Sequence, residues 1–279
     1  MYKINILLYY MLIIISCNSR KTNSNISLQN QESFPAKDPN QVIYDTTIKT
    51  IHVLVALCDN KFQGIVPVPA RIGNGQDPNS NLYWGCGYGV RSYFKNSKSW
   101  TFLKSYRVDS IKLERLIFKN KKANYYLVAD AYDGKYIKNC TIDFLKSCSG
   151  QIKDTVNINQ KTIGINGNSN LIAYIGHDGL MDFKLNEQYN NLDNKIRKAI
   201  ILACISKKYF ARALLFTKAK PLVWSTGLMS PEAYTLHDAV ESFIENDTDA
   251  QIEINAAKAY SKYQKCSLNA AKKLLVSGF

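Results

Sequence analysis

The stretch of sequence that decides the fold is residues 171–206, LIAYIGHDGLMDFKLNEQYNNLDNKIRKAIILACIS. It contains two short apolar runs, residues 171–175 and residues 199–203, separated by about two dozen mostly polar residues. That separation is long enough for a crossover helix, so we expect a strand, a helix and a second, parallel strand. The carboxyl ends of both strands then meet at the edge where open α/β sheets place their chemistry.

Reactive side chains follow both apolar runs. The first run leads into Gly176-His177-Asp178-Gly179, and the second leads into Cys204. A lone cysteine after an apolar strand is more often a small core residue, and a lone histidine there is more often structural. A histidine and a cysteine that reach the same sheet edge together are a candidate base and nucleophile. Both interpretations remain open at this point.

The remaining sequence extends the same alternation of strands and helices. With 279 residues, of which 46% are hydrophobic, the chain can form a substantial core. We predict an α/β fold over residues 49–279, a three-layer α/β/α sandwich with a mostly parallel sheet and additional C-terminal helices. The further strands are expected at residues 51–58, 100–108, 113–118, 125–129 and 222–226, and the helices at residues 81–94, 135–147, 207–217, 230–244, 249–264 and 268–276.

The N-terminus has the pattern of an export signal. Lys3 precedes an apolar run at residues 6–15, too short to cross a bilayer but suited to the central region of a secretory signal. The sequence Ile14-Ile15-Ser16-Cys17 resembles a bacterial lipobox. The resemblance implies a signal peptide at residues 1–16, lipidation of Cys17 and a membrane anchor on the periplasmic or surface side of the cell envelope.

Residues 17–48 are rich in Asn, Ser, Gln and Lys and contain few large apolar side chains. Such a composition cannot bury enough surface to offset the entropy of ordering, so we predict a flexible tether between anchor and domain.

Charge and cysteine spacing exclude several function classes. The net charge is +14, but the lysines are scattered and accompany no nucleic-acid-binding motif, so a solvated surface is favoured over a nucleic-acid partner. The glycine-rich turn at residues 72–78 lacks the Lys-Ser/Thr of a phosphate loop. The seven cysteines, at positions 17, 58, 86, 140, 148, 204 and 266, form no CxxC pair. No metal and no cofactor are therefore expected.

The order of elements resembles the caspase–haemoglobinase fold shared by caspases, legumains, gingipains and related clan CD cysteine peptidases. In that group one apolar strand ends in His-Gly and the next ends in Ala-Cys. The matching pieces here are the runs before His177 and before Cys204, and Ala203-Cys204-Ile205-Ser206 is similar to the legumain context Ala-Cys-x-Ser. This chain departs from the pattern by carrying Asp178 between the histidine and Gly179.

The resemblance implies a cysteine endopeptidase acting on a peptide or protein substrate. Cys204 would attack the scissile carbonyl, and His177 would transfer the protons. The backbone N–H groups of Cys204 and of Asp178 or Gly179 would stabilise the oxyanion.

Three aspartates at predicted strand ends, Asp59, Asp133 and Asp178, are candidates for reading a basic substrate side chain. One alternative is an inactive lipoprotein of the same fold that serves as a binding or scaffold module for a peptide or an envelope glycan. Another is adhesion to the envelope through the positive charge.

Overall fold

The computed structural model describes residues 43–279, so the expected signal peptide, Cys17 and most of the expected tether lie outside the described residues. The strands of the main sheet are β1 (Lys49–Ala56), β2 (Trp100–Tyr106), β3 (Lys112–Asn120), β4 (Tyr125–Tyr132), β7 (Leu171–Ile175), β8 (Lys198–Leu202), β9 (Lys220–Ser225) and β10 (Leu275–Val276). The helices are α1 (Val90–Lys95), α2 (Ile137–Ser149), α3 (Ser206–Thr217), α4 (Ala233–Ile244), α5 (Asp249–Gln264) and α6 (Leu268–Leu274). The strands β5 (Lys153–Ile158) and β6 (Lys161–Asn166) form a separate hairpin.

No helix among residues 43–279 is both long and apolar enough to span a membrane.

The main sheet is mostly parallel, as predicted. Its order is β10-β9-β8-β7-β1-β4-β3-β2, and the five strands from β9 to β4 all run in the same direction. The hairpin of β2 and β3 adds an antiparallel edge beside β4, and β10 adds a short one beside β9. The strand order reverses between β1 and β7, which makes the crevice at their carboxyl ends the expected binding position of such a sheet.

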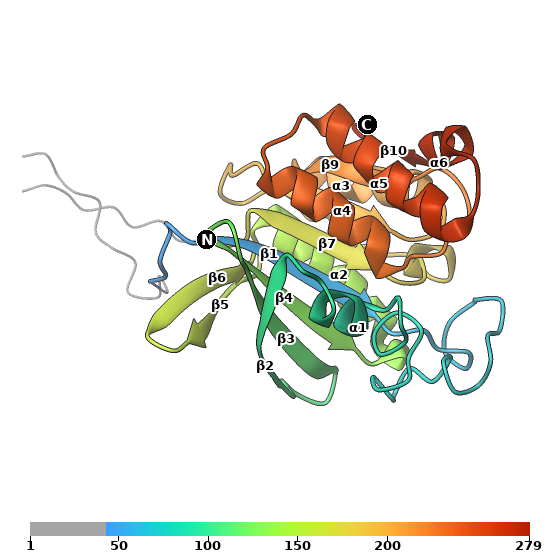
Figure 1. The fold of residues 1–279 in the computed structure, drawn as a ribbon, viewed down its shortest axis with the longest axis horizontal. Coiled ribbons are helices and arrows are strands. Elements are labelled where there is room, and N and C mark those ends of the chain that lie inside the picture. Colours follow the sequence, from blue (N-terminus) through green and yellow to red (C-terminus); the bar gives the residue numbers. More distant parts are fainter. Residues whose placement is uncertain (1–42) are drawn as a thin grey trace, which may run out of the picture. The chain divides into compact units, whose positions relative to one another are not determined.

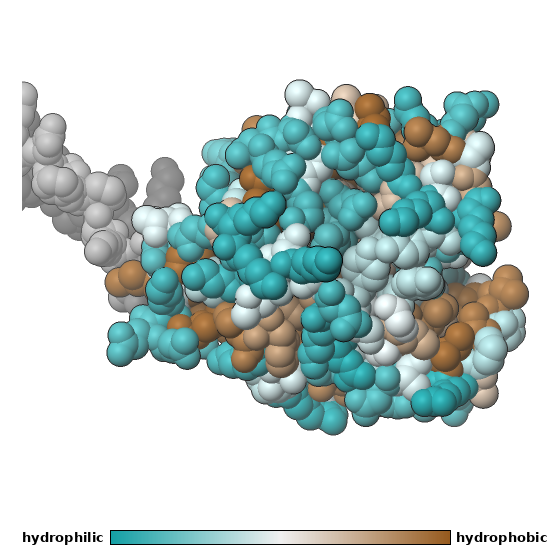
Figure 2. Space-filling model, in the orientation of Figure 1, coloured by the Kyte–Doolittle hydropathy of each residue, from teal (hydrophilic) through white to brown (hydrophobic). Residues whose placement is uncertain are grey.

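Helices cover both faces of the sheet (Figure 1). On one face the alternate side chains of β1, β7 and β8 pack with α2 and α3, and on the other they pack with α1, α4 and α5. The central strands β1 and β7 are accordingly buried along nearly their whole length and consist mostly of apolar residues, as expected for strands covered on both faces. Figure 2 shows that hydrophilic side chains predominate over α4 and α5 on the solvent side. The predicted α/β class with C-terminal helices is confirmed, and the layers are consistent with the predicted sandwich.

The connection from β7 to β8 differs from the prediction, because it contains no crossover helix. Only a short 3-10 turn, Gly179–Met181, interrupts an otherwise irregular segment. Asparagine side chains compete with helical hydrogen bonds, and Asn191 illustrates this by donating to the carbonyls of Lys195 and Thr217. The fully buried Arg197 then holds the end of the segment through Asp193.

Two helix starts also differ from the prediction. The expected helix over residues 81–94 forms only as the short α1, because the chain around Gly85 and Gly89 turns so tightly that a Cβ there would meet backbone atoms. Helix α4 starts at Ala233, three residues after the expected cap Ser230, and its Glu232 makes no side-chain cap bond.

The hairpin of β5 and β6 occupies residues 153–166.

A buried charge network fixes the packing of three neighbouring strands. Arg115 of β3 donates two hydrogen bonds to Asp130 of β4, at 2.6 and 2.7 Å. His52 of β1 lies 3.0 Å from the same carboxylate through Nε2, while its Nδ1 accepts the N–H of Asn166. The imidazole is therefore neutral, with its proton on Nε2. Burial would raise the pKa of Asp130, but the hydrogen bonds from Arg115 and His52 lower it overall.

We predict that Asp130→Asn destabilises the fold, because it leaves the Arg115 guanidinium buried without a counter-charge. The loss in the free energy of unfolding should be about 3–5 kcal/mol at pH 7, measured by urea denaturation. Asp154→Asn, an exposed change on β5, is the matched control. Because the pKa of Asp130 is lowered in the folded state, the difference between the two proteins should shrink as the pH falls below about 4. A loss no greater than that of the control would contradict this role.

Candidate active site at the carboxyl edge of the sheet

His177 and Cys204 follow adjacent parallel strands at the same level. Ile175 of β7 pairs with Leu202 of β8, and each candidate residue lies two positions beyond its strand's paired residue. Adjacent strands lie about 4.8 Å apart, so the two chain segments leave the sheet side by side. The chain passes close to β1 directly after β7, and this approach requires a glycine at position 176. Gly176 has a φ of 143°, and a Cβ there would meet the carbonyl of Ala56.

The turn after β8 presents Cys204 on a tight bend. Cys204 is half-buried, and the next residue, Ile205, has the left-handed conformation with φ 51° and ψ 30°. A β-branched residue is strongly disfavoured there, so the surrounding structure must hold it in place. Helix α3 begins at once with Ser206. The result is a strand, a sharp turn and a helix with the thiol at the turn.

A pair of buried serines holds this bend. Ser206 donates its N–H to Ser225 Oγ at 3.1 Å, and Ser225 donates its N–H to Ser206 Oγ at 2.9 Å. The Ser206 hydroxyl donates to the carbonyl of Ile201, and the Ser225 hydroxyl donates to that of Ala203. Ser206 belongs to the motif Ala203-Cys204-Ile205-Ser206, which is visible in the sequence. Its partner Ser225 was missed, because Ser225 reaches Ser206 only through the pairing of β8 with β9.

The Cys204 sulfur is held by the backbone of Met229, in the loop after β9. The N–H of Met229 donates to Sγ at 3.4 Å, and the thiol donates to its carbonyl at 3.4 Å. Burial raises the pKa of the Cys204 thiol, the Met229 N–H opposes this, and the charge of Asp178 raises it further. The resting thiol is therefore protonated at neutral pH and needs a proton acceptor to become a nucleophile.

His177 is oriented by a carboxylate that sequence reasoning missed. Its Nε2 lies 2.8 Å from Asp182 Oδ2, which also accepts the N–H of Gly64. The Tyr174 hydroxyl donates to the His177 carbonyl at 2.7 Å. Asp182 lies at the end of the 3-10 turn, five residues after the histidine. A separation of five residues does not by itself predict that the two side chains meet. Among residues 43–279 no hydrogen bond joins His177 to Cys204, so the dyad stays a prediction.

Asp178 is the most perturbed carboxyl group at this edge. Its Oδ1 accepts the N–H of Leu180, while its buried Oδ2 has no hydrogen-bond partner in the described part of the chain. Burial raises the pKa of Asp178 to about 7, and the charge of Asp182 adds to the effect. This side chain therefore changes charge near neutral pH, and its charge acts on the Cys204 thiol.

All three expected oxyanion donors are free. Within residues 43–279 the structure pairs none of the N–H groups of Cys204, Asp178 and Gly179 with an acceptor. Gly179, the third candidate, begins the 3-10 turn that follows, with the ring of Phe183 packed where its Cβ would lie. Free backbone donors beside a thiol are what an oxyanion requires.

The other two aspartates expected to bind substrate lie together at the ends of β1 and β4. Gln76 Nε2 donates to Asp59 Oδ2 at 2.7 Å and to Asp133 Oδ1 at 2.6 Å. Both carboxylates are buried, and they also accept the backbone N–H groups of Lys61 and Lys135. They therefore hold the loops around Gln76 in place, and Asp178 is the aspartate of the three with a fully buried oxygen that has no partner among residues 43–279.

Comparison with known proteins gives no assignment. No family model, no curated protein and no solved structure matches the chain. Within residues 43–279 no group of three or more His, Cys, Asp or Glu side chains could hold a metal ion.

We predict that Asp178→Asn accelerates alkylation of Cys204. Removing the charge of Asp178 lowers the thiol pKa, and the thiolate fraction at a given pH rises tenfold for each unit by which it falls. The measurement is the pH dependence of iodoacetamide labelling at Cys204, read by mass spectrometry, with Asp154→Asn as control. An unchanged labelling profile would show that the two groups do not interact.

Proposed function

We propose that this chain is a lipid-anchored cysteine endopeptidase of the bacterial cell envelope, with a caspase-like fold, Cys204 as nucleophile and His177 as general base and acid. The observation that carries the proposal is the register of β7 and β8, which brings the two residues to the same level of neighbouring strand ends. The anchoring part of the proposal rests on the lipobox-like sequence before Cys17.

Three further features support this reading. The parallel strands have a switch point next to β7, so the residues after β7 and β8 border the crevice where such sheets bind ligands. A strained residue, Ile205, directly follows the thiol, and strain of this kind concentrates at functional sites. A carboxylate, Asp182, orients the histidine, as the third group of a catalytic triad does.

The proposed reaction uses these groups in sequence. Because Asp182 holds Nε2 of His177, the imidazole takes the Cys204 proton through Nδ1. The thiolate attacks the peptide carbonyl, and the N–H groups of Cys204 and Asp178 bind the oxyanion. The C–N bond breaks as His177 protonates the leaving amine, which leaves a thioester. Water then attacks the thioester with His177 as base, and the C–S bond breaks to release the acid. His177 returns its proton to the Cys204 thiolate, which restores the resting thiol.

Substrate selection falls to Asp178 in this proposal. Asp59 and Asp133 are already held by Gln76, whereas the second oxygen of Asp178 is unpaired and buried at the crevice. A lysine or arginine side chain there would satisfy that oxygen and stabilise its ionised form.

A second candidate function, a non-catalytic binding module of the same fold, is favoured by the state of the thiol. Burial raises the pKa of Cys204, and both of its hydrogen bonds close on Met229. A substrate would have to displace that arrangement, whereas a structural cysteine would keep it.

We expect Cys204→Ala and His177→Ala each to abolish cleavage of a mixed peptide library. Asp182→Asn should lower kcat by 10- to 100-fold with little effect on KM, because it disturbs only the orientation of the imidazole. Cys266→Ala, a change of a half-buried free thiol in the loop before α6, is the matched control. Cleavage that survives Cys204→Ala would rule out the proposed nucleophile and leave the binding module.

The anchor has its own test. Cys17→Ser should prevent incorporation of radiolabelled palmitate and release the protein from the membrane fraction, because acyl chains on Cys17 supply the membrane affinity. Cys266→Ser is the control, since it removes a thiol without touching the lipobox-like sequence. Palmitate labelling that persists in Cys17→Ser would contradict the anchor.

A further inference from the structure

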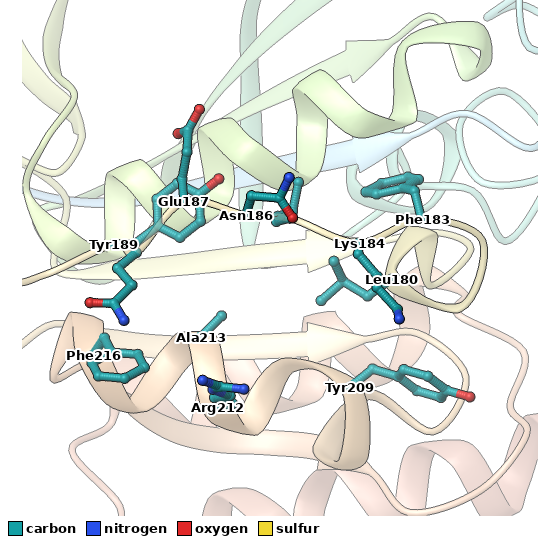
Figure 3. Close-up of a pocket in the computed structure, with 12 residues that line it drawn as sticks. Leu180, Phe183, Lys184, Asn186, Glu187, Tyr189, Tyr209, Arg212, Ala213 and Phe216 are labelled. Carbon is teal, nitrogen blue, oxygen red and sulfur yellow. The ribbon is translucent and has the colours of Figure 1, made fainter.

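A pocket of about 360 Å³ lies between the segment after β7 and helix α3 (Figure 3). One wall comes from Leu180 and residues 183–189, and the other from Tyr209, Arg212, Ala213 and Phe216 of α3. The volume falls within the range of small-molecule sites. Neither wall contains His177, Asp178 or Cys204, so the pocket is separate from the proposed active site.

The pocket has an apolar interior. Leu180, Phe183 and Phe216 contribute apolar surface, and Ala213 leaves room between the turns of α3. Gly179 makes this possible, because the ring of Phe183 packs where a Cβ of that residue would lie. An apolar lining of this kind recognises the body of a ligand through burial of its surface.

The charged groups of the pocket are predominantly basic. Figure 3 shows Lys184 extending from the loop toward α3, where Arg212 lies, while Glu187 points away from α3. The Glu187 carboxylate instead lies 4.0 Å from Lys146 of α2. Among residues 43–279 neither Lys184 nor Arg212 forms an ion pair. Two unneutralised cations beside an apolar surface favour a ligand that is apolar and anionic.

Tyr189 adds a buried ring to the pocket. It lines the cavity and is only 1% exposed. Burial raises the pKa of Tyr189 to about 12, and the charge of the neighbouring Glu187 adds to the effect, so the hydroxyl keeps its proton. Figure 3 shows this hydroxyl on the side of Glu187 and away from α3, so what Tyr189 offers the pocket is the apolar surface of its ring.

From this combination we propose that the pocket binds a carboxylate attached to an apolar body, with Arg212 and Lys184 facing the carboxylate and the aromatic side chains enclosing the body. Two sources share this chemistry, a free aromatic acid and the C-terminal residue of a peptide. The proposal does not depend on the peptidase activity.

The test measures binding by isothermal titration calorimetry to the full chain carrying Cys204→Ala, so that no turnover interferes. The probes are 4-phenylbutyrate and its neutral amide, and the peptide Gly-Ala-Ala-Phe with a free or an amidated C-terminus. The acids should bind at least tenfold more tightly than the amides. Tighter binding of the peptide acid would identify a peptide C-terminus as the ligand, and tighter binding of phenylbutyrate would identify a free acid.

Variants locate the binding. Arg212→Gln should weaken binding of the acids about tenfold and leave the amides unchanged, whereas Arg107→Gln, an exposed arginine on the loop after β2, should change neither. Ala213→Trp should fill the pocket and abolish binding of every probe, with circular dichroism to confirm folding. Equal binding of acids and amides, or binding unaffected by Arg212→Gln or by a folded Ala213→Trp, would overturn the proposal.

Discussion

The position of β1 is the constraint on which the rest of the structure depends. This strand is buried on both faces, so its backbone N–H and C=O groups can be satisfied only by parallel pairing with β4 on one side and β7 on the other. That double pairing creates the reversal of strand order and brings His52 next to Asp130. On its other side β7 pairs with β8, so the carboxyl ends of these two strands lie next to the switch point. Both the candidate active site and the buried charge network follow from it.

The middle of the sheet and its carboxyl edge use buried polar groups differently. At the middle of β1, β3 and β4, His52, Asp130 and Arg115 satisfy one another and leave no group free to react. At the carboxyl edge the balance is incomplete, because Asp178 keeps one oxygen unpaired and the N–H of Cys204 has no acceptor among the described residues. Buried polar groups without hydrogen-bond partners cost stability, and the same free groups are what a site needs in order to bind a ligand.

More of the fold than of the candidate site could be predicted from the sequence. Continuous apolar runs such as residues 51–58 identify buried strands directly, and helix α5 agrees with its predicted bounds, because periodicity and capping are local signals. The irregular segment between β7 and β8 could not be predicted, because the Asn191 side chain in it donates to the carbonyl of Thr217, which is distant in the sequence. Asp182 and Ser225 escaped detection for the same reason, since their partners meet them only after the sheet has assembled.

The irregular connection from β7 to β8 has an evolutionary consequence. In a helix, an inserted or deleted residue would rotate every later side chain around the helix axis. An irregular chain that is held at its far end by Arg197 can gain or lose residues mainly at the cost of loop-closure entropy. Relatives of this chain would then differ most in the length of residues 183–196, while the strand ends on either side stay in register. One wall of the pocket against α3 could diversify without any change to the sheet that supports it.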